Sequence, residues 1–329
     1  MPPTDPLSQV IATLHKGQRF FLISHVRPDG DAIGSLAGLA RSLRKAGKTV
    51  DLGLVDPPPE RFGFLLEGET VRKPGDLALD HDAIVILDTG DLPRTGFAEA
   101  LAKPATVVIN IDHHPSNTSF GDINLLDFHA SSTCEMVVTL IERARLPFDP
   151  DVAQGLYLGL CTDTRFFQNE NLRPAAHHAA QRLLETGLEA ATIHGRLLST
   201  RKLSEVRILG HALTRLTVEL DGRLAWVALS TADLAQQGAT MNDVFACGLF
   251  NQLTGIDGVV ASVGIVENTD GKVYCEFRSR KGFDVKEIAV AMGGGGHLAA
   301  SGCNREAPLA TMVDEALGHL RNRLGSFPR

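Results

Sequence analysis

Short apolar runs alternate with a helical pattern in the first half of the chain. The runs are FFLIS (20–24), TVDLGLV (49–55), AIVILD (83–88) and VVINID (107–112), and a helix is predicted from about Ala32 to Ala46, where Gly47 ends it. This alternation is typical of βαβ units, which form a parallel sheet with helices on both faces. We therefore predict an α/β domain at the N-terminus.

Helical patterns dominate from Ser131 to about Leu213, and strand patterns follow. TRLTVEL and LAWVALS flank DGR, and VVASVGIVE and KVYCEFRS flank NTDG, so two hairpins are predicted. Helices near 284–292 and 308–323 complete a smaller α/β domain with a mixed sheet. We place the first domain at residues 1–190, a helical linker at 191–212 and the second domain at 213–329.

Composition narrows the class of protein. The chain has 329 residues, 43% hydrophobic and 22% charged, which fits a globular protein of about two domains. Without a signal-peptide pattern or an apolar run of about 18 residues, we expect a cytoplasmic protein with no membrane partner. The formal charge of −7 argues against binding to duplex DNA. Five scattered cysteines without a C-x-x-C pair argue against a disulfide framework or a thiolate zinc site.

Acids and imidazoles recur where the predicted elements end. They are His25, Asp29 and Asp31 after the first strand, Asp88 after AIVIL, Asp112, His113 and His114 at the end of VVINI, and Asp163 after a helical stretch. Ligands of open α/β sheets bind outside the carboxyl ends of the strands. Taken alone, one such residue, Asp31, could simply cap the next helix. Repetition at three strand ends favours a site.

The residue types indicate metal chemistry. Carboxylates and imidazoles without thiolates suit Mn²⁺, Mg²⁺ or Fe²⁺ better than structural zinc. One ion rarely needs so many ligands, whereas two neighbouring ions would use them to clamp the attacking and leaving oxygens of a phosphoryl displacement. The residues therefore predict a two-metal phosphoesterase.

These motifs resemble those of the DHH phosphoesterase superfamily, in the same order along the chain. The resemblance implies that one ion is bound by His25, Asp29 and Asp88, and the other by Asp31, Asp88, His113 and Asp163, with Asp88 as the bridge. It also implies that His114 faces the substrate phosphate and that Asp112 orients an imidazole. Asp88, His114 and Asp112 are therefore the predicted catalytic residues, and Mn²⁺ is the expected metal.

The C-terminal part resembles the DHHA1 substrate domain. GGGGHLAASG (293–302) is similar to its Gly-Gly-Gly-His signature, and FRSR (277–280) to its basic strand. Exposed backbone N–H groups of a glycine run can form an anion-binding nest. The predicted substrate-binding residues are His114, Arg278, Ser279, Arg280, Gly294, Gly295, Gly296 and His297. The alternatives are a flexible glycine linker and a solvated strand face for Arg278 and Arg280.

One position departs from the family pattern. The last acidic motif usually reads Asp-Thr-Gly, whereas this chain has Asp163, Thr164 and Arg165. A bulky cation thus replaces glycine beside the predicted site, which makes substrate preference the open question.

Within the superfamily, the length and the DHHA1-like tail resemble the nanoRNase group. That resemblance implies hydrolysis of very short RNAs to mononucleotides and dephosphorylation of 3′-phosphoadenosine 5′-phosphate (pAp) to AMP. The alternatives are a phosphodiesterase for cyclic or linear dinucleotides (c-di-AMP, pApA), a family II inorganic pyrophosphatase, a single-strand exonuclease, and a nucleotide-sensing module without turnover. The sequence leaves cleavage polarity and a homodimer open.

Overall fold

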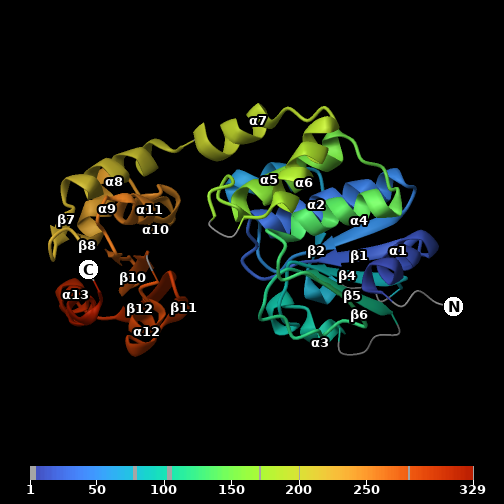
Figure 1. The fold of residues 1–329 in the computed structure, drawn as a ribbon. Coiled ribbons are helices and arrows are strands. Elements are labelled where there is room, and N and C mark those ends of the chain that lie inside the picture. Colours follow the sequence, from blue (N-terminus) through green and yellow to red (C-terminus); the bar gives the residue numbers. More distant parts are fainter. Residues whose placement is uncertain are drawn as a thin grey trace. The chain divides into compact units, whose positions relative to one another are not determined.

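Each of two six-stranded sheets belongs to its own part of the chain (Figure 1). The computed structural model describes residues 5–76, 80–101, 106–169, 172–199, 201–280 and 282–328. The chain divides into two units, Met1–Ser199 and Thr200–Arg329. The predicted linker contains most of α7 (Ala190–His194), the π-helical turn Gly195–Ser199 and most of α8 (Leu203–Thr214). No helix among the described residues is long and apolar enough to cross a membrane.

The sheet of unit 1 is entirely parallel, with the order β3-β2-β1-β4-β5-β6. Its strands are β1 (Arg19–Ile23), β2 (Thr49–Gly53), β3 (Val71–Arg72), β4 (Ala83–Leu87), β5 (Val107–Asp112) and β6 (Ile123–Leu126). The chain builds outward from β1 to β3 and then returns to place β4 on the other side of β1. The carboxyl ends of β1 and β4 therefore lie at the topological switch point, where such sheets bind ligands.

Helices cover both faces of this sheet, as predicted. They are α1 (Pro6–Lys16), α2 (Gly30–Lys45), α3 (Ala98–Leu101), α4 (Thr133–Ala144), α5 (Pro150–Asp163) and α6 (Pro174–Glu185), with 3-10 turns at Glu60–Leu66, Pro74–Asp76 and Pro93–Thr95. Figure 1 shows α2, α4 and α5 on one face and α3 on the other. The larger core lies under α2, α4 and α5, and a smaller one under α3 contains Phe21, Ile84 and Phe97.

The sheet of unit 2 is mixed, which confirms the predicted fold class. Its order is β11-β12-β10-β9-β8-β7, in which β8 and β9 are parallel and the other pairs antiparallel. The strands are β7 (Thr217–Glu219), β8 (Leu224–Leu229), β9 (Ala261–Glu267), β10 (Lys272–Ser279), β11 (Gly295–His297) and β12 (Ala300–Glu306). The helices, besides α8, are α9 (Thr231–Gln237), α10 (Met241–Ala246), α11 (Leu249–Gly255), α12 (Lys286–Ala291) and α13 (Leu309–Ser326). Separate cores lie on the two faces.

A glycine-lined contact brings α2 and α5 together. A Cβ atom added to Gly34 would lie 2.4 Å from the carbonyl oxygen of Gly155, and one added to Gly159 would lie 3.0 Å from the Cα of Asp31. Larger side chains would push the two backbones apart. Because Asp31 begins α2 and Asp163 ends α5, this close approach sets the distance between the two carboxylates.

Gly34→Ala should therefore destabilise unit 1. The added methyl group meets backbone rather than a movable side chain, so we expect the free energy of unfolding to fall by about 1–3 kcal/mol, the usual cost of overpacking. Urea unfolding followed by circular dichroism measures it. Gly63→Ala is the control, since its Cβ would meet nothing within 4 Å. Equal stability of the two variants would contradict the tight contact.

The turn after α5 has an uncommon backbone. Arg165, Phe166 and Phe167 have φ angles of 48°, 57° and 63°, in the left-handed region that favours glycine. Hydrogen bonds hold the turn, since the N–H of Phe166 donates to Cys161 O (2.7 Å) and that of Phe167 to Thr164 Oγ1 (3.1 Å). The family glycine is thus replaced by arginine at a position whose conformation suits glycine.

Arg165→Gly should stabilise the protein. Replacing a non-glycine residue in the left-handed region removes strain of about 1–2 kcal/mol from the folded state. The greater backbone entropy of glycine in the unfolded chain offsets about 0.5–1 kcal/mol of this gain. We expect a small rise in the free energy of unfolding, measured in urea. Arg145→Gly is the matched control, since Arg145 has φ 51° at the end of α4. A loss of stability in Arg165→Gly alone would show that its side chain has a structural role.

Candidate metal centre

The predicted metal ligands meet at the carboxyl edge of the parallel sheet of unit 1. His25 follows β1, Asp88 follows β4, His113 follows β5 and Asp163 ends α5. The Nε2 atom of His25 lies 3.4 Å from Asp88 Oδ2. The Nε2 atom of His113 lies 3.6 Å from Asp88 Oδ1 and 3.5 Å from Asp163 Oδ2. Residues up to 138 positions apart in the sequence thus share one small volume.

Asp88 stands at the middle of this cluster. Its side chain is buried and its φ of 56° is left-handed, so the chain turns sharply directly after β4. The backbone N–H of Asp88 donates to Ile111 O (3.0 Å), and the hydroxyl of Thr133 donates to Asp88 Oδ1 (3.1 Å). Such backbone strain persists where the surroundings fix it, commonly at functional sites.

Asp31 belongs to α2, and its carboxylate lies at the N-terminus of α4. The backbone N–H groups of Thr133 and Cys134 donate to its two carboxylate oxygens at 2.6 and 2.9 Å. These N–H groups have no partner within the helix, and the helix dipole favours an anion there. The cap of α2 is Asp29, whose Oδ1 accepts from Asp31 N (3.0 Å) and Ala32 N (3.1 Å). The capping alternative raised for Asp31 therefore applies to Asp29.

The imidazoles of His25 and His113 present the same nitrogen to the carboxylates. The Nδ1 atom of His25 lies 2.9 Å from Val26 O, and that of His113 lies 3.3 Å from Ala130 O. A carbonyl can only accept, so each Nδ1 carries the proton. In the neutral form of each imidazole Nε2 then has the lone pair, and this orientation toward the carboxylates is how metal-binding histidines are usually held.

The donor atoms form two groups suited to two ions. Ligand atoms of His25, Asp29 and Asp88 lie within 4.8 Å of one another, as do those of Asp31, His113 and Asp163. A third group, Asp88 with His113 and His114, overlaps both. The four carboxylates carry the charge that two divalent cations would neutralise. The donor set therefore fits a pair of divalent ions.

Burial and mutual repulsion raise the pKa values of two acids in the cluster. Burial raises the pKa of Asp31 well above its usual value, and the charges of Asp88 and Asp163 add to this. Burial also raises the pKa of Asp163, to about 7. Burial alone would lower the pKa of His113, but its hydrogen bond to Asp88 and the nearby carboxylates raise it to about 10. Without cations, the cluster therefore holds protons.

Opposing effects act on the pKa of Asp88. Burial raises the pKa of Asp88, yet hydrogen bonds from His113 and His25 outweigh burial and lower it.

Cys134 lies beside the cluster as a neutral thiol. Its Sγ lies 3.6 Å from the backbone oxygen of Asp31, and burial raises the pKa of this thiol well above its usual value. A protonated thiol is a poor ligand, which leaves oxygen and nitrogen donors.

His114 and Asp112 form a pair beside the metal ligands. The Nδ1 atom of His114 lies 2.7 Å from Asp112 Oδ1, and this hydrogen bond raises the pKa of His114. Asp112 is fully buried, whereas 32% of the His114 side chain is exposed. The imidazole is thus accessible from solvent and fixed from behind, which is the arrangement that a substrate-facing role requires.

In unit 2, the predicted basic residues lie at the end of β10 and directly after it. Arg278 pairs with Glu276 (3.0 Å) and lies 5.7 Å from the ring centre of Phe250, while Arg280 is exposed. Ser279 is buried, and its hydroxyl donates to Phe283 O (2.5 Å). The predicted contact of Ser279 with substrate stays a prediction, and the observed bond holds the loop that carries Arg280.

The glycine run forms part of a hairpin. Gly295 to His297 form β11 on the edge of the sheet of unit 2, antiparallel to β12, so this part of the run is not a flexible linker. Anion binding by its backbone N–H groups stays a prediction. A Cβ atom on Gly294 would lie 2.1 Å from Gly302 O, and one on Gly296 would lie 2.6 Å from Ser301 Cα. Close backbone approach therefore requires these glycines. His297 is exposed at the end of the strand.

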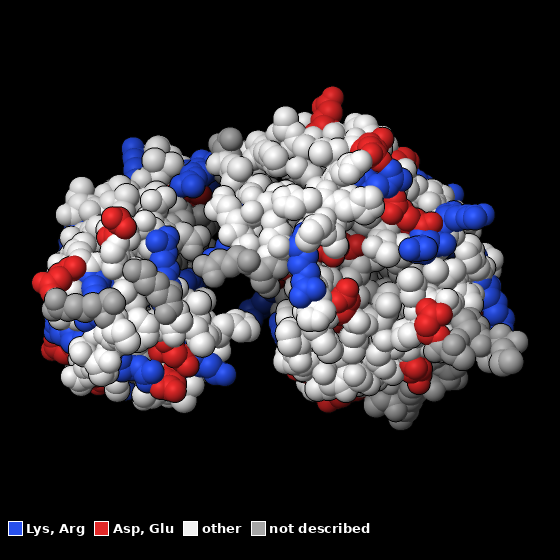
Figure 2. Space-filling model, in the orientation of Figure 1, with Lys and Arg blue, Asp and Glu red and all other residues white. Residues whose placement is uncertain are grey.

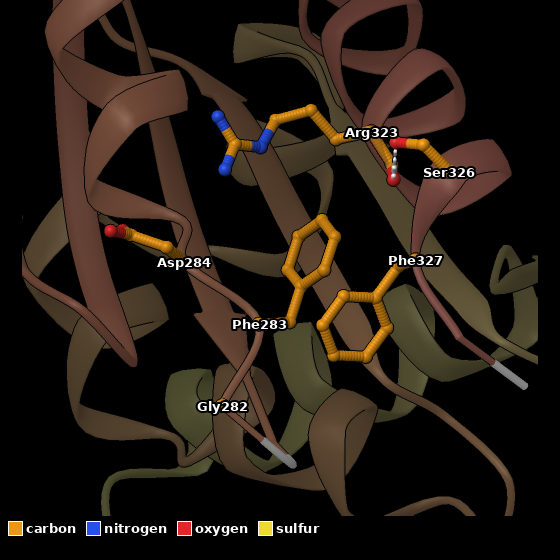
Figure 3. A pocket seen from close by; sticks show the side chains of 6 residues that line it. All are labelled: Gly282, Phe283, Asp284, Arg323, Ser326 and Phe327. Atoms are coloured by element: carbon orange, nitrogen blue, oxygen red, sulfur yellow. Dashed lines mark hydrogen bonds between the residues drawn. The ribbon is translucent and has the colours of Figure 1, made fainter.

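A pocket of about 330 Å³ lies in unit 2, and the segment that follows Arg280, Gly282 to Asp284, forms part of its lining (Figure 3). Phe283 and Phe327 face each other in it, with ring centres 5.1 Å apart. Its one cationic side chain, Arg323, pairs with Glu287. The pocket therefore offers little charge for a phosphate, in contrast to the exposed Arg280.

Surface charge agrees with the low net charge of the chain. On the face seen in Figure 2, the described Lys and Arg side chains are scattered among Asp and Glu. Duplex DNA is usually bound by a continuous basic surface. The expectation that duplex DNA is not a ligand stays a prediction.

Two family profiles match the chain. The DHH family, N-terminal domain, matches residues 19–160, and the DHHA1 domain matches residues 231–326. The chain is 32% identical over 289 residues to the bifunctional oligoribonuclease and PAP phosphatase NrnA of Thermus thermophilus, covering 86% of this chain and 82% of that protein. It is 26% identical over 332 residues to the cyclic-di-AMP phosphodiesterase GdpP of Geobacillus thermodenitrificans, covering 95% of this chain and 48% of that protein.

Solved structures share the fold. An exopolyphosphatase-related protein from Bacteroides fragilis has a TM-score of 0.86 and 25% identity, with 97% of each chain covered. RecJ from Thermus thermophilus in complex with Mn²⁺ has a TM-score of 0.57 and 16% identity, covering all of this chain and 56% of that one. The resemblance inferred from the motifs is therefore confirmed, and the chain belongs to the DHH family with a C-terminal DHHA1 domain, together with the NrnA proteins.

Proposed function

We propose that this chain is a two-metal phosphoesterase that hydrolyses very short RNAs to mononucleotides and dephosphorylates pAp to AMP. The pair of donor groups around Asp88 carries the proposal, because it suits two neighbouring cations. The name of the NrnA relative, and the length over which the two chains match, support this choice of substrates.

The side chains of unit 1 would share the chemistry. His25, Asp29 and Asp88 would hold one ion, and Asp31, Asp88, His113 and Asp163 the other. When bound, such ions lower the pKa of a water molecule and neutralise charge on a phosphate. Asp88 would keep the two sites at a fixed separation, because its own backbone and Thr133 hold it in place. His114 would donate a hydrogen bond to the phosphate, and Asp112 would orient it.

Residues of unit 2 would recognise the rest of the substrate. Arg280 and His297 are exposed, and Arg280 follows β10 two residues after Arg278, so strand alternation would direct both arginines to one side. An arginine pair is suited to a non-reacting phosphate. Gly295, where an added Cβ would meet nothing within 4 Å, would allow close approach of the substrate to backbone, and Gly294 and Gly296 would shape the hairpin beside it. Ser279 would hold the Arg280 loop.

Mn²⁺ is the metal that we propose, with Mg²⁺ or Fe²⁺ as alternatives, because the donors are carboxylates and imidazoles. The RecJ neighbour in complex with Mn²⁺ supports this choice. We also propose a cytoplasmic location, which rests on the sequence alone.

A second candidate function is hydrolysis of cyclic or linear dinucleotides. The similarity to GdpP over 95% of the chain favours it. Such an enzyme would use the same donor groups and differ only in the residues that grip the substrate.

Asp88→Asn should abolish turnover. With Mn²⁺, the wild-type protein should release AMP from pAp and cut short RNA, and EDTA should stop both reactions. The variant should lose more activity than the about 10- to 100-fold typical of removing an outer partner of a metal site, since the ligand that both ions would share is gone. Chromatography of the products with pAp, pApA, short RNA, c-di-AMP and pyrophosphate measures this.

Asp151→Asn is the control, because this exposed carboxylate pairs with Arg41 and Lys45 at the opposite end of α5. Full activity of Asp88→Asn would overturn the two-metal assignment. Wild-type activity confined to the dinucleotides would keep the metal centre and favour the second function.

Binding of Mn²⁺ should release protons. In the metal-free protein His113, with a pKa of about 10, and Asp163, with a pKa of about 7, hold protons at neutral pH. Ions compete with these protons, so metal affinity should rise as the pH increases from 6 to 8. Calorimetric titrations in two buffers of different ionisation enthalpy count the protons. His113→Ala should release fewer, and a heat that does not depend on the buffer would contradict the protonation of these two groups.

A further inference from the structure

Asn117 lies directly behind the His114 and Asp112 pair. Its Nδ2 atom is 2.6 Å from Asp112 Oδ2, on the carboxylate whose other oxygen contacts His114. The same amide nitrogen lies 2.8 Å from Asn110 Oδ1 and 3.2 Å from Thr89 O. A chain of hydrogen bonds thus runs from β5 through Asn117 and Asp112 to His114.

Local sequence brings Asn117 back to this point. His114, Pro115, Ser116 and Asn117 form a turn closed by a bond from Asn117 N to His114 O (3.0 Å). Proline at the second position favours such a turn. The orientation of the amide is set from its other end, because Ser119 N donates to Asn117 Oδ1 (2.7 Å). The nitrogen therefore faces Asp112.

Both oxygens of Asp112 are thereby engaged from opposite sides. A carboxylate with one partner can rotate about its terminal bond, whereas one held at both oxygens cannot without losing a hydrogen bond. Asp112 is fully buried, so water cannot readily replace the missing donor. The orientation of the Asp112 carboxylate, and so of its hydrogen bond to the His114 imidazole, thus depends on Asn117.

We propose that Asn117 is a positioning residue for the phosphoesterase reaction, which fixes Asp112 and through it the orientation of the His114 imidazole. The effect on turnover rests on the proposed function, whereas the effect on the imidazole does not.

The rate test uses Asn117→Ala with Mn²⁺ and pAp. We expect kcat to fall about 10- to 100-fold, the usual cost of losing a partner that orients a residue of a metal site. KM and calorimetric Mn²⁺ affinity should stay within about twofold to threefold of the wild-type values, because no metal donor is removed. Asn124→Ala is the matched control, since the hydrogen bonds of that amide within the described part of the chain go to Gly121, so its loss should leave kcat unchanged.

The decisive comparison is with His114→Ala. If Asn117 acts through His114, adding Asn117→Ala to that variant should cost nothing further in kcat, because residues that act as a unit are not additive. A further loss as large as in the wild-type background would overturn the proposal. So would a fall in Mn²⁺ affinity equal to the fall in kcat, which would place the effect at Thr89 and Asp88.

Proton NMR of the metal-free protein provides a readout independent of turnover. The downfield Nδ1 proton signal that disappears in His114→Ala should be broadened by exchange in Asn117→Ala and retained in Asn124→Ala. An unchanged signal would overturn the positioning role. If Asn117→Ala fails to fold, Asn117→Ser takes its place. Absence of turnover in the wild type with this NMR result intact would reject the proposed function and keep the positioning role.

Discussion

The concentration of four carboxylates, Asp88 with Asp29, Asp31 and Asp163, is the constraint that the rest of unit 1 satisfies. Buried charges of one sign are unstable together unless protons, cations or dipoles balance them. The fold supplies the N-terminus of α4 to Asp31 and two imidazoles to Asp88. These partners balance only part of the charge, since Asp31 and Asp163 still favour protons. A pair of divalent ions would supply the positive charge that is still needed to balance these carboxylates.

The parallel sheet and one helix contact deliver these groups from distant parts of the chain. The switch between β1 and β4 places His25 beside Asp88 because the strands that precede them are neighbours. The glycines between α2 and α5 bring Asp31 toward Asp163, which no strand carries. Backbone packing thus determines the distances between donors, and the side chains need little freedom of their own.

Much of this centre could be predicted from sequence, because strand ends are readable from an apolar run followed by a polar residue. His25, Asp88 and His113 follow that rule, and Asp163 follows from the family order. Thr133 and Asn117 were missed, because their partners lie 45 residues away or behind a turn whose closure the sequence does not show. Short elements such as β6 and α10 were also missed, since four to six residues carry too little periodicity. The hairpin formed by the glycine run depends on Gly302 and Ser301, which only the fold brings close.

Selection among substrates cannot come from the metal donors. Every rival substrate offers a phosphate to them, and relatives of this chain are named for such different substrates as pAp and cyclic di-AMP. Discrimination must therefore rest on side chains outside the donor set. Arg278 has part of its charge balanced by Glu276, whereas no ion pair of Arg280 or Arg165 is found among the described residues. Of these two, Arg165 stands where the family has glycine, two residues after Asp163. If this protein prefers a different nucleotide from its relatives, the difference is most simply placed at that left-handed turn.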